Sequence, residues 1–223
     1  MSITRYGYRH AVSGFFEFPT ENAKRLLPSH LEPLEPHHGI SVFSLTAFDF
    51  TESMVGCYGE VVASVIVAPL IRPGERFPKS AFYPYLVGTT TQAAREHAIE
   101  RWHLPHWMED VEMAFSQSGG EITVKVAEGG SPIAEMTIAE HAASPVSHLY
   151  QCFMRNGNGS YMAKITMEGK QSEHEDERGR LTLFEHPFHD GLAIEDVADT
   201  PFRELWMRDG QQLFDPLLRL GPA

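Results

Sequence analysis

A glutamate and a histidine hold the positions at which this sequence could perform acid–base chemistry. Glu60 lies between Gly59 and an apolar, β-branched run, so its side chain is expected to face an apolar interior. Burial there would raise its pKa and suit the carboxyl group to proton transfer. His106 follows Pro105, and an imidazole with an ordinary pKa of about 6.5 can also transfer protons at neutral pH. The alternatives are a hydrogen-bonded structural carboxylate and a neutral histidine that only fills space.

Several aromatic residues could line a ligand pocket. Tyr83 and Tyr85 flank Pro84, and Trp107 follows His106. Aromatic side chains often form the walls of apolar pockets, and a tryptophan can stack on a planar ligand. Core packing explains the same residues equally well, so both interpretations stay open.

Twelve histidines raise the question of a metal site. His103 and His106 are three residues apart, and so are His186 and His189, which Asp190 follows. Histidine with carboxylate suits zinc or iron, but these spacings match no metal motif. The two cysteines are too few for a disulfide framework or a multi-cysteine zinc site. We therefore expect neither a metal nor another cofactor.

The composition is that of a globular protein with an acidic surface. The 223 residues carry 30 acidic and 18 basic side chains, a net charge of −12, and 42% are hydrophobic. This length fits a single domain spanning residues 1–223. An acidic surface repels phosphate backbones, which argues against a nucleic-acid partner. The longest apolar run, 61–71, is interrupted by Ser64 and Pro69 and is too short for a bilayer, so no membrane partner is expected. The first residues show no apolar signal core, which predicts a cytoplasmic location.

The periodicity of the sequence is mostly that of β-strands. Ile122, Val124 and Val126 alternate with polar residues, and Gly129-Gly130 predicts a hairpin to the next strand. Further strands are expected at 43–50, 61–70, 133–140, 146–154 and 161–168.

Two helices interrupt the strand pattern. Thr20 is a suitable N-cap for a helix over 21–27, and Thr91 for one over 92–102. Many short strands with few helices predict a mainly β protein of the α+β kind, a barrel or sandwich with helices at its rim.

Three segments carry a resemblance to a known family. Residues 26–34 read LLPSHLEPL, residues 57–62 read CYGEVV, and residues 98–107 read AIERWHLPHW. In this order they resemble the LLP-x-x-LEP turn, the Y-x-E strand and the GRE-x-W-G-x-P-K-K segment of the acetoacetate decarboxylase superfamily. The resemblance covers roughly residues 15–140 and implies a closed, cone-like antiparallel β-barrel around a cavity, in a homo-oligomer. Trp102 matches the tryptophan of the third segment and is a further candidate ligand contact.

The residues that carry the family's chemistry differ in this sequence. Decarboxylation of a β-keto acid needs an electron sink, which a lysine imine supplies. The family's lysine pair falls on His106 and Trp107. An arginine that meets the substrate carboxylate falls on Glu17, which is a further candidate ligand contact. Only Glu60 keeps the family's acidic identity, so the resemblance argues against acetoacetate decarboxylation. Of the five lysines, Lys164 could face a barrel interior, although an outward-facing strand lysine is the favoured interpretation.

These observations lead to two main hypotheses. The first is a lysine-free enzyme, a lyase, dehydratase or isomerase, that acts on a small carbonyl or enol compound through Glu60 and His106. The second is a non-catalytic protein of the same fold that binds a small metabolite. A third and weaker hypothesis is a decarboxylase that uses a displaced lysine. In each case the expected partner is a small molecule.

Overall fold

Strands make up most of the protein. The computed structural model describes residues 3–221. The elements in chain order are β1 (Thr4–Pro19), α1 (Thr20–Leu26), β2 (Ile40–Glu52), β3 (Tyr58–Ile66), β4 (Ser80–Thr89), α2 (Gln92–Trp102), β5 (Glu112–Ser118), β6 (Glu121–Glu128), β7 (Ser131–Ala139), β8 (Ser144–Asn156), β9 (Gly159–His174), β10 (Arg180–Leu183), the 3-10 helices η1 (Pro187–His189) and η2 (Ile194–Asp196), β11 (Arg203–Phe214) and β12 (Leu218–Gly221).

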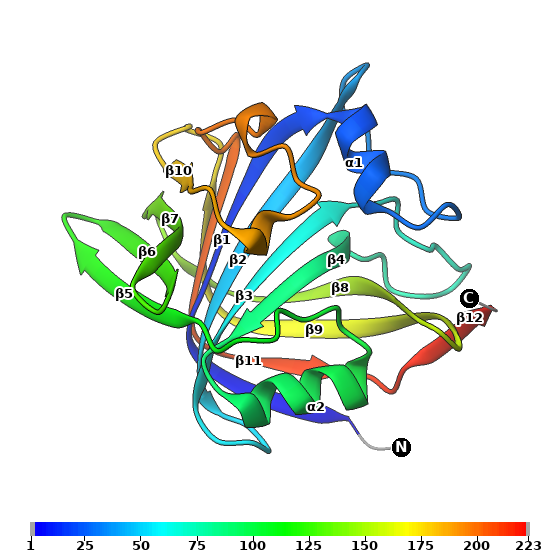
Figure 1. Ribbon diagram of the computed structural model, residues 1–223. Helices are drawn as coiled ribbons and strands as arrows, with labels where there is room; N and C mark the ends of the chain where they lie inside the picture. Colours follow the sequence, from blue (N-terminus) through cyan, green and yellow to red (C-terminus); the bar gives the residue numbers. More distant parts are fainter. Residues whose placement is uncertain (1–2, 222–223) are drawn as a thin grey trace.

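Seven strands close into a barrel. Their order is β11, β1, β2, β3, β4, β8 and β9, and β9 pairs again with β11 to complete the ring. The short strand β12 also pairs with β9. Figure 1 shows these strands fanning out across the molecule, with α2 at its lower edge. Ala94 and Trp102 of α2 pack on Phe50 and Tyr58, whose strand faces look into the barrel, so α2 covers one end of it. The mainly β, closed-barrel fold predicted from the sequence is confirmed.

One pair of barrel strands departs from the predicted antiparallel pattern. β4 and β8 run parallel, with residues 80–82 beside residues 150–152. The other neighbouring pairs of the ring are antiparallel. Parallel neighbours need a long crossover connection. The chain between β4 and β8 supplies it with α2 and the strands β5, β6 and β7.

A second sheet, in the order β10, β7, β6, β5, covers the outside of the barrel. The predicted alternation in β6 is confirmed, because Ile122, Val124 and Val126 are buried while Lys125 is exposed. These side chains share one hydrophobic core with outward-facing residues of β1, β2 and β3, among them Phe16. β1 is therefore buried on both faces, since one face looks into the barrel and the other lies under the second sheet.

The two helices begin close to the predicted positions. α2 spans the predicted residues, and the Thr91 hydroxyl accepts a hydrogen bond from the Ala94 N–H at 3.3 Å. Thr20, the predicted cap of α1, is instead its first residue, and the helix ends at Leu26, one residue before the predicted end. The Thr20 hydroxyl does not cap the helix and contacts the Ser41 hydroxyl at 2.9 Å. Among residues 3–221, no helix has the length and apolar character needed to cross a membrane.

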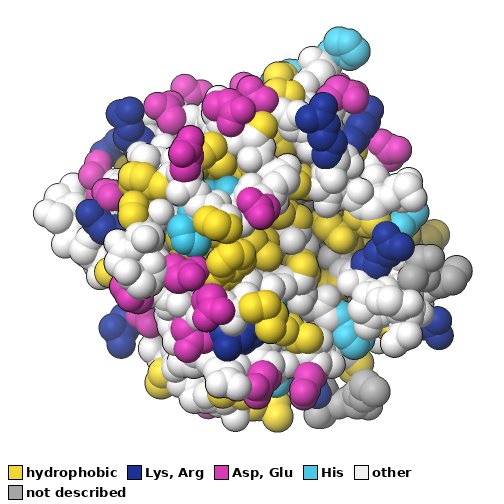
Figure 2. All heavy atoms as spheres, in the orientation of Figure 1, with side chains coloured by type: hydrophobic (Ala, Val, Ile, Leu, Met, Phe, Trp, Pro, Cys, Tyr) yellow, Lys and Arg dark blue, Asp and Glu magenta, His cyan; other side chains and the backbone are white. Residues whose placement is uncertain are grey.

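The surface near the second sheet carries charges of both signs. On the face drawn in Figure 2, acidic side chains surround a central group of hydrophobic ones, and basic side chains are dispersed among them. This mixture agrees with the excess of acidic residues in the sequence.

Candidate functional site

A cavity of about 110 Å³ lies inside the barrel, and apolar side chains form most of its wall. Each strand of the ring contributes alternate residues, as the pleat of a β-strand requires. The polar lining is small: three hydroxyl residues, one cysteine, one tyrosine, one amide and one carboxyl group. They are Ser13, Thr46, Ser64, Cys152, Tyr150, Gln212 and Glu60. The lining residues include no lysine, arginine or histidine.

Glu60 brings the only carboxyl group of this lining into the cavity. It lies on β3 between Phe48 of β2 and Thr89 of β4, on the same strand face as Val62 and Ser64. Within residues 3–221 no hydrogen bond or ion pair to the Glu60 carboxyl group is found. Burial raises the pKa of Glu60 to about 8. The carboxyl group is thus mostly protonated at neutral pH and is able to donate a hydrogen bond or, after ionisation, to accept a proton.

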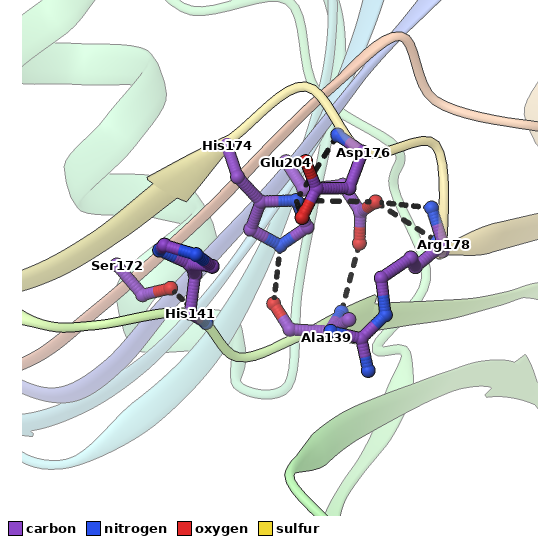
Figure 3. Close-up of polar contacts among 8 residues, drawn as sticks. Ala139, His141, Ser172, His174, Asp176, Arg178 and Glu204 are labelled. Atoms are coloured by element: carbon purple, nitrogen blue, oxygen red, sulfur yellow. Dashed lines mark hydrogen bonds and ion pairs between the residues drawn. The ribbon is translucent and has the colours of Figure 1, made fainter.

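A fully buried carboxylate, Glu204, shows what a structural role looks like in the same barrel. Its side chain is fully buried and accepts hydrogen bonds from the backbone N–H groups of Ala139, Arg178 and Gly179 at 2.8–2.9 Å. Figure 3 shows Glu204 beside His174, whose Nε2 lies 2.9 Å from the Ala139 carbonyl oxygen. These bonds occupy both Glu204 oxygens and tie β11 to β7 and to the 175–179 loop. Glu60 has no such partners, which distinguishes it as a group available to a ligand.

His106 and Trp107 lie beside the barrel wall, and neither is among the residues that line the cavity. Their segment runs along the edge of β4, where His106 bridges to Val87. The Nδ1 atom of His106 is 2.7 Å from the Trp107 carbonyl oxygen, and desolvation lowers its pKa. The Trp107 indole donates to Glu128 at 2.6 Å and packs on the core under the second sheet. From this segment the cavity is lined by Leu104 instead.

The two tyrosines proposed as ligand contacts face away from the cavity. Tyr83 packs with a separate hydrophobic cluster and Tyr85 with the core under the second sheet. Phe82 and Pro84, which alternate with them on β4, line the cavity. The alternation was visible in the sequence, but which of its two faces looks inward depends on the closure of the barrel.

The candidates Trp102 and Glu17 lie outside the cavity as well. Trp102 is buried at the end of α2, where its Nε1–H donates to the Tyr6 hydroxyl at 2.7 Å. Glu17 is exposed on β1, two residues beyond the cavity-lining Phe15. None of the six candidates other than Glu60 lines the cavity with it, although Trp102 and Glu60 both line a small adjoining pocket.

The five lysines also lie outside the cavity lining. Lys164 is the lysine for which a position inside the barrel was the alternative interpretation. Its side chain instead extends to the surface, where Nζ is 2.6 Å from the Glu75 Oε2 atom. Lys24, Lys79 and Lys125 are paired with glutamates as well, and Lys170 is exposed. Within residues 3–221 no cluster of three or more potential metal ligands is present.

Sequence reasoning missed the small polar residues of the cavity. Ser13, Thr46 and Gln212 have ordinary sequence surroundings, and only the alternation along their strands could have indicated them. The hydroxyl groups of Ser13 and Thr46 are 2.9 Å apart across β1 and β2. They form a polar spot in a mostly apolar wall.

Solved structures with the same fold are acetoacetate decarboxylases and related enzymes. The acetoacetate decarboxylase of Legionella pneumophila is 16% identical with a TM-score of 0.70, and covers 100% of this chain and 88% of its own. MppR, an enduracididine biosynthesis enzyme complexed with pyruvate, is 11% identical with a TM-score of 0.66. The match covers 100% of this chain and 91% of the MppR chain. An acetoacetate decarboxylase-like enzyme from Sphingomonas wittichii RW1 is 13% identical with a TM-score of 0.62. The match covers 99% of this chain and 94% of that enzyme's chain.

These likenesses confirm the resemblance predicted from the sequence at the level of the fold: the chain has the acetoacetate decarboxylase-like fold. No protein-family model matches the sequence, and a search of curated proteins finds no match either.

Proposed function

We propose that this protein binds a small, uncharged carbonyl or enol compound in the barrel cavity, and that Glu60 moves a proton to or from it without a lysine imine. The observation that carries the proposal is a carboxyl group without a protein partner in a cavity lined by no cation. An enzyme of this kind would be an isomerase, dehydratase or lyase of acid–base mechanism.

The cavity favours a neutral ligand over an anion. A carboxylate brought into an apolar cavity loses its hydration, and no lysine or arginine of the lining would compensate for that loss. At high pH the ionised Glu60 would add a repulsion. A ketone, aldehyde or enol needs only hydrogen bonds, which Glu60 and the hydroxyls of Ser13, Thr46 and Ser64 can provide.

The proton transfer balances with Glu60 alone. The ionised carboxylate takes a proton from the carbon next to a carbonyl group, and the C–H electron pair becomes the double bond of an enolate. The protonated acid returns the proton to carbon or oxygen. With a pKa of about 8, about a tenth of the molecules hold the base form at pH 7, and the rest hold the acid form.

The test is hydrogen–deuterium exchange at carbon in a panel of small ketones and aldehydes, followed by NMR in D₂O. We expect the wild-type protein to label at least one neutral compound, and Glu60→Gln to slow that labelling about 10²- to 10⁴-fold. His106→Ala should keep the wild-type rate, because His106 does not line the cavity. Equal rates in Glu60→Gln and wild type, or labelling confined to keto acids, would contradict the proposal.

A second function, ligand binding without catalysis, is favoured by one observation. Glu60 is the only titratable carboxyl or imidazole group of the lining, so no partner residue completes an acid–base pair in the cavity. A native mass spectrum with a retained small molecule that the protein does not label would support this function. A borohydride-stable adduct on Lys164 with a β-keto acid would instead support the decarboxylase hypothesis.

A further inference from the structure

A short chain of hydrogen bonds leads from the neighbourhood of Glu60 toward the outside of the barrel. The Trp102 Nε1–H donates to the Tyr6 hydroxyl at 2.7 Å, and the same hydroxyl is 2.7 Å from His97 Nε2. Since Trp102 already donates to the Tyr6 oxygen, the Tyr6 proton can be donated to His97. Tyr6 lies on β1 and lines the small pocket beside Glu60, whereas His97 lies on α2, which covers this end of the barrel.

The inner end of this chain meets Glu60 across a small space. A pocket of about 20 Å³ is lined by Glu60, Tyr6, His97 and Gln212, among others. This volume exceeds the roughly 10–15 Å³ that one water molecule needs, and the lining offers that molecule several polar partners. Glu60 and Gln212 also line the main cavity, so the pocket adjoins the ligand site directly.

The outer end of the chain reaches the surface. His97 and Trp102 line a groove of about 590 Å³ whose wall includes the exposed Met54. Desolvation, with Arg101 as a further cause, lowers the pKa of His97, so its imidazole is neutral at pH 7 and Nε2 can accept a proton. The imidazole can then release a proton from Nδ1 toward the groove.

We propose that Tyr6 and His97 form a proton path that connects Glu60 to solvent on the side of α2, with one water molecule bridging Glu60 and Tyr6. Outward, Glu60 gives its proton to the water, the water gives one to the Tyr6 oxygen, and Tyr6 passes its own proton to His97. The imidazolium then loses its other proton to solvent. Each outward passage moves one proton, leaves Glu60 ionised and converts His97 from the Nδ1–H to the Nε2–H tautomer. Inward transfer is the reverse and restores both side chains.

This path gives the proposed acid–base function a way to reset. The cavity lining holds no cation or imidazole that could exchange a proton with Glu60. A ligand that fills the cavity would also block the access of water to Glu60 from that side. A side route lets Glu60 exchange its proton while the ligand stays bound. The inference therefore rests on the proposed function, but the path itself can be tested in the absence of any ligand.

The test follows the infrared carboxyl band of Glu60, assigned as the band that Glu60→Gln removes, after rapid mixing of the protein into D₂O. The band is recorded about one pH unit below the midpoint of its own titration. We expect Tyr6→Phe and His97→Gln to slow its deuteration about tenfold or more. His97→Gln is the sharper variant, because its amide oxygen still accepts a hydrogen bond from Tyr6 but cannot pass a proton on. Tyr83→Phe, which removes a tyrosine hydroxyl outside both the cavity and the path, should exchange at the wild-type rate.

Wild-type exchange rates in both folded variants, with folding checked by near-ultraviolet circular dichroism, would overturn the path. The proposed function fails in a different way. The proposed function is contradicted if the Glu60 band titrates near pH 4.5, the ordinary range of a glutamate. The exchange rates of the variants can still be compared in that case, about one pH unit below the lower midpoint, so the path is tested independently.

Discussion

At the scale of single residues, two glutamates of one barrel illustrate how the surroundings set the role of a carboxyl group. Glu204 accepts three backbone hydrogen bonds and holds segments of the fold together. Glu60 faces an apolar cavity without a protein partner, and burial alone raises its pKa. A carboxylate saturated by donors has little capacity left for a ligand, whereas an unsatisfied carboxyl group is held in the fold at a cost in stability.

The raised pKa of Glu60 predicts a pH-dependent stability. The folded protein binds the Glu60 proton more tightly than the unfolded chain, so this residue makes stability fall as pH rises from about 4.5 to about 8. Glu60→Gln lacks this effect. We expect the free energy of unfolding of Glu60→Gln, relative to that of the wild type, to rise by about 4 kcal/mol at most between pH 5 and pH 9. Urea unfolding at the two pH values measures this difference.

Glu204→Gln is the matched control for that experiment. Its amide offers one acceptor oxygen instead of two, which leaves a buried N–H group without a partner. We expect a loss of about 1–3 kcal/mol. A difference between Glu60→Gln and wild type that is equal at pH 5 and pH 9 would refute the raised pKa of Glu60.

At the scale of elements, α2 has a role beyond covering the barrel. It follows β4 directly, begins the crossover to the parallel strand β8, and carries both His97 and Trp102. Its first turn is fixed by the Thr91 side chain, which satisfies one of the free N–H groups at the start of the helix. The position of the Tyr6 contacts therefore depends on a helix cap.

Removal of that cap should weaken the helix. We expect Thr91→Ala to lower the free energy of unfolding by about 1 kcal/mol, because the Ala94 N–H loses its acceptor. Thr91→Ser keeps a hydroxyl group and should stay within a few tenths of a kcal/mol of the wild type. Chemical denaturation measures the free energy of unfolding of the three proteins. An equal loss in both variants would show that the stabilising group is the Thr91 methyl group and not its hydroxyl.

At the scale of the whole molecule, the resemblance predicts a homo-oligomer. The loop between β3 and β4 exposes Ile71 and Phe77, the latter at 66%. Contact with a second copy would remove this apolar surface from water. We expect light scattering to give the mass of an oligomer for the wild type and of a single chain for Phe77→Asp.

Met108→Asp changes an equally exposed apolar residue on a different loop, so it is the control for that experiment. It should leave the oligomer intact. A wild-type protein with the mass of one chain would show that the prediction of a homo-oligomer is wrong.

The sequence by itself predicted much of the local structure and proposed Glu60 as the candidate acid. Alternation located β6, Thr91 marked the start of α2, and three short segments indicated the fold. A glutamate next to a buried run is expected to be either paired or functional because burial of a carboxyl group is costly, and the structure places Glu60 in the cavity lining.

Only the tertiary structure decided which residues surround that acid. His106 and Trp107 pack beside β4, and Tyr83 and Tyr85 occupy the outward face of that strand. Alternation divides a strand into two faces, but it carries no information on which face becomes the interior. That is settled when β9 pairs with β11, because ring closure joins residues far apart in the chain and leaves one side of every strand around the cavity.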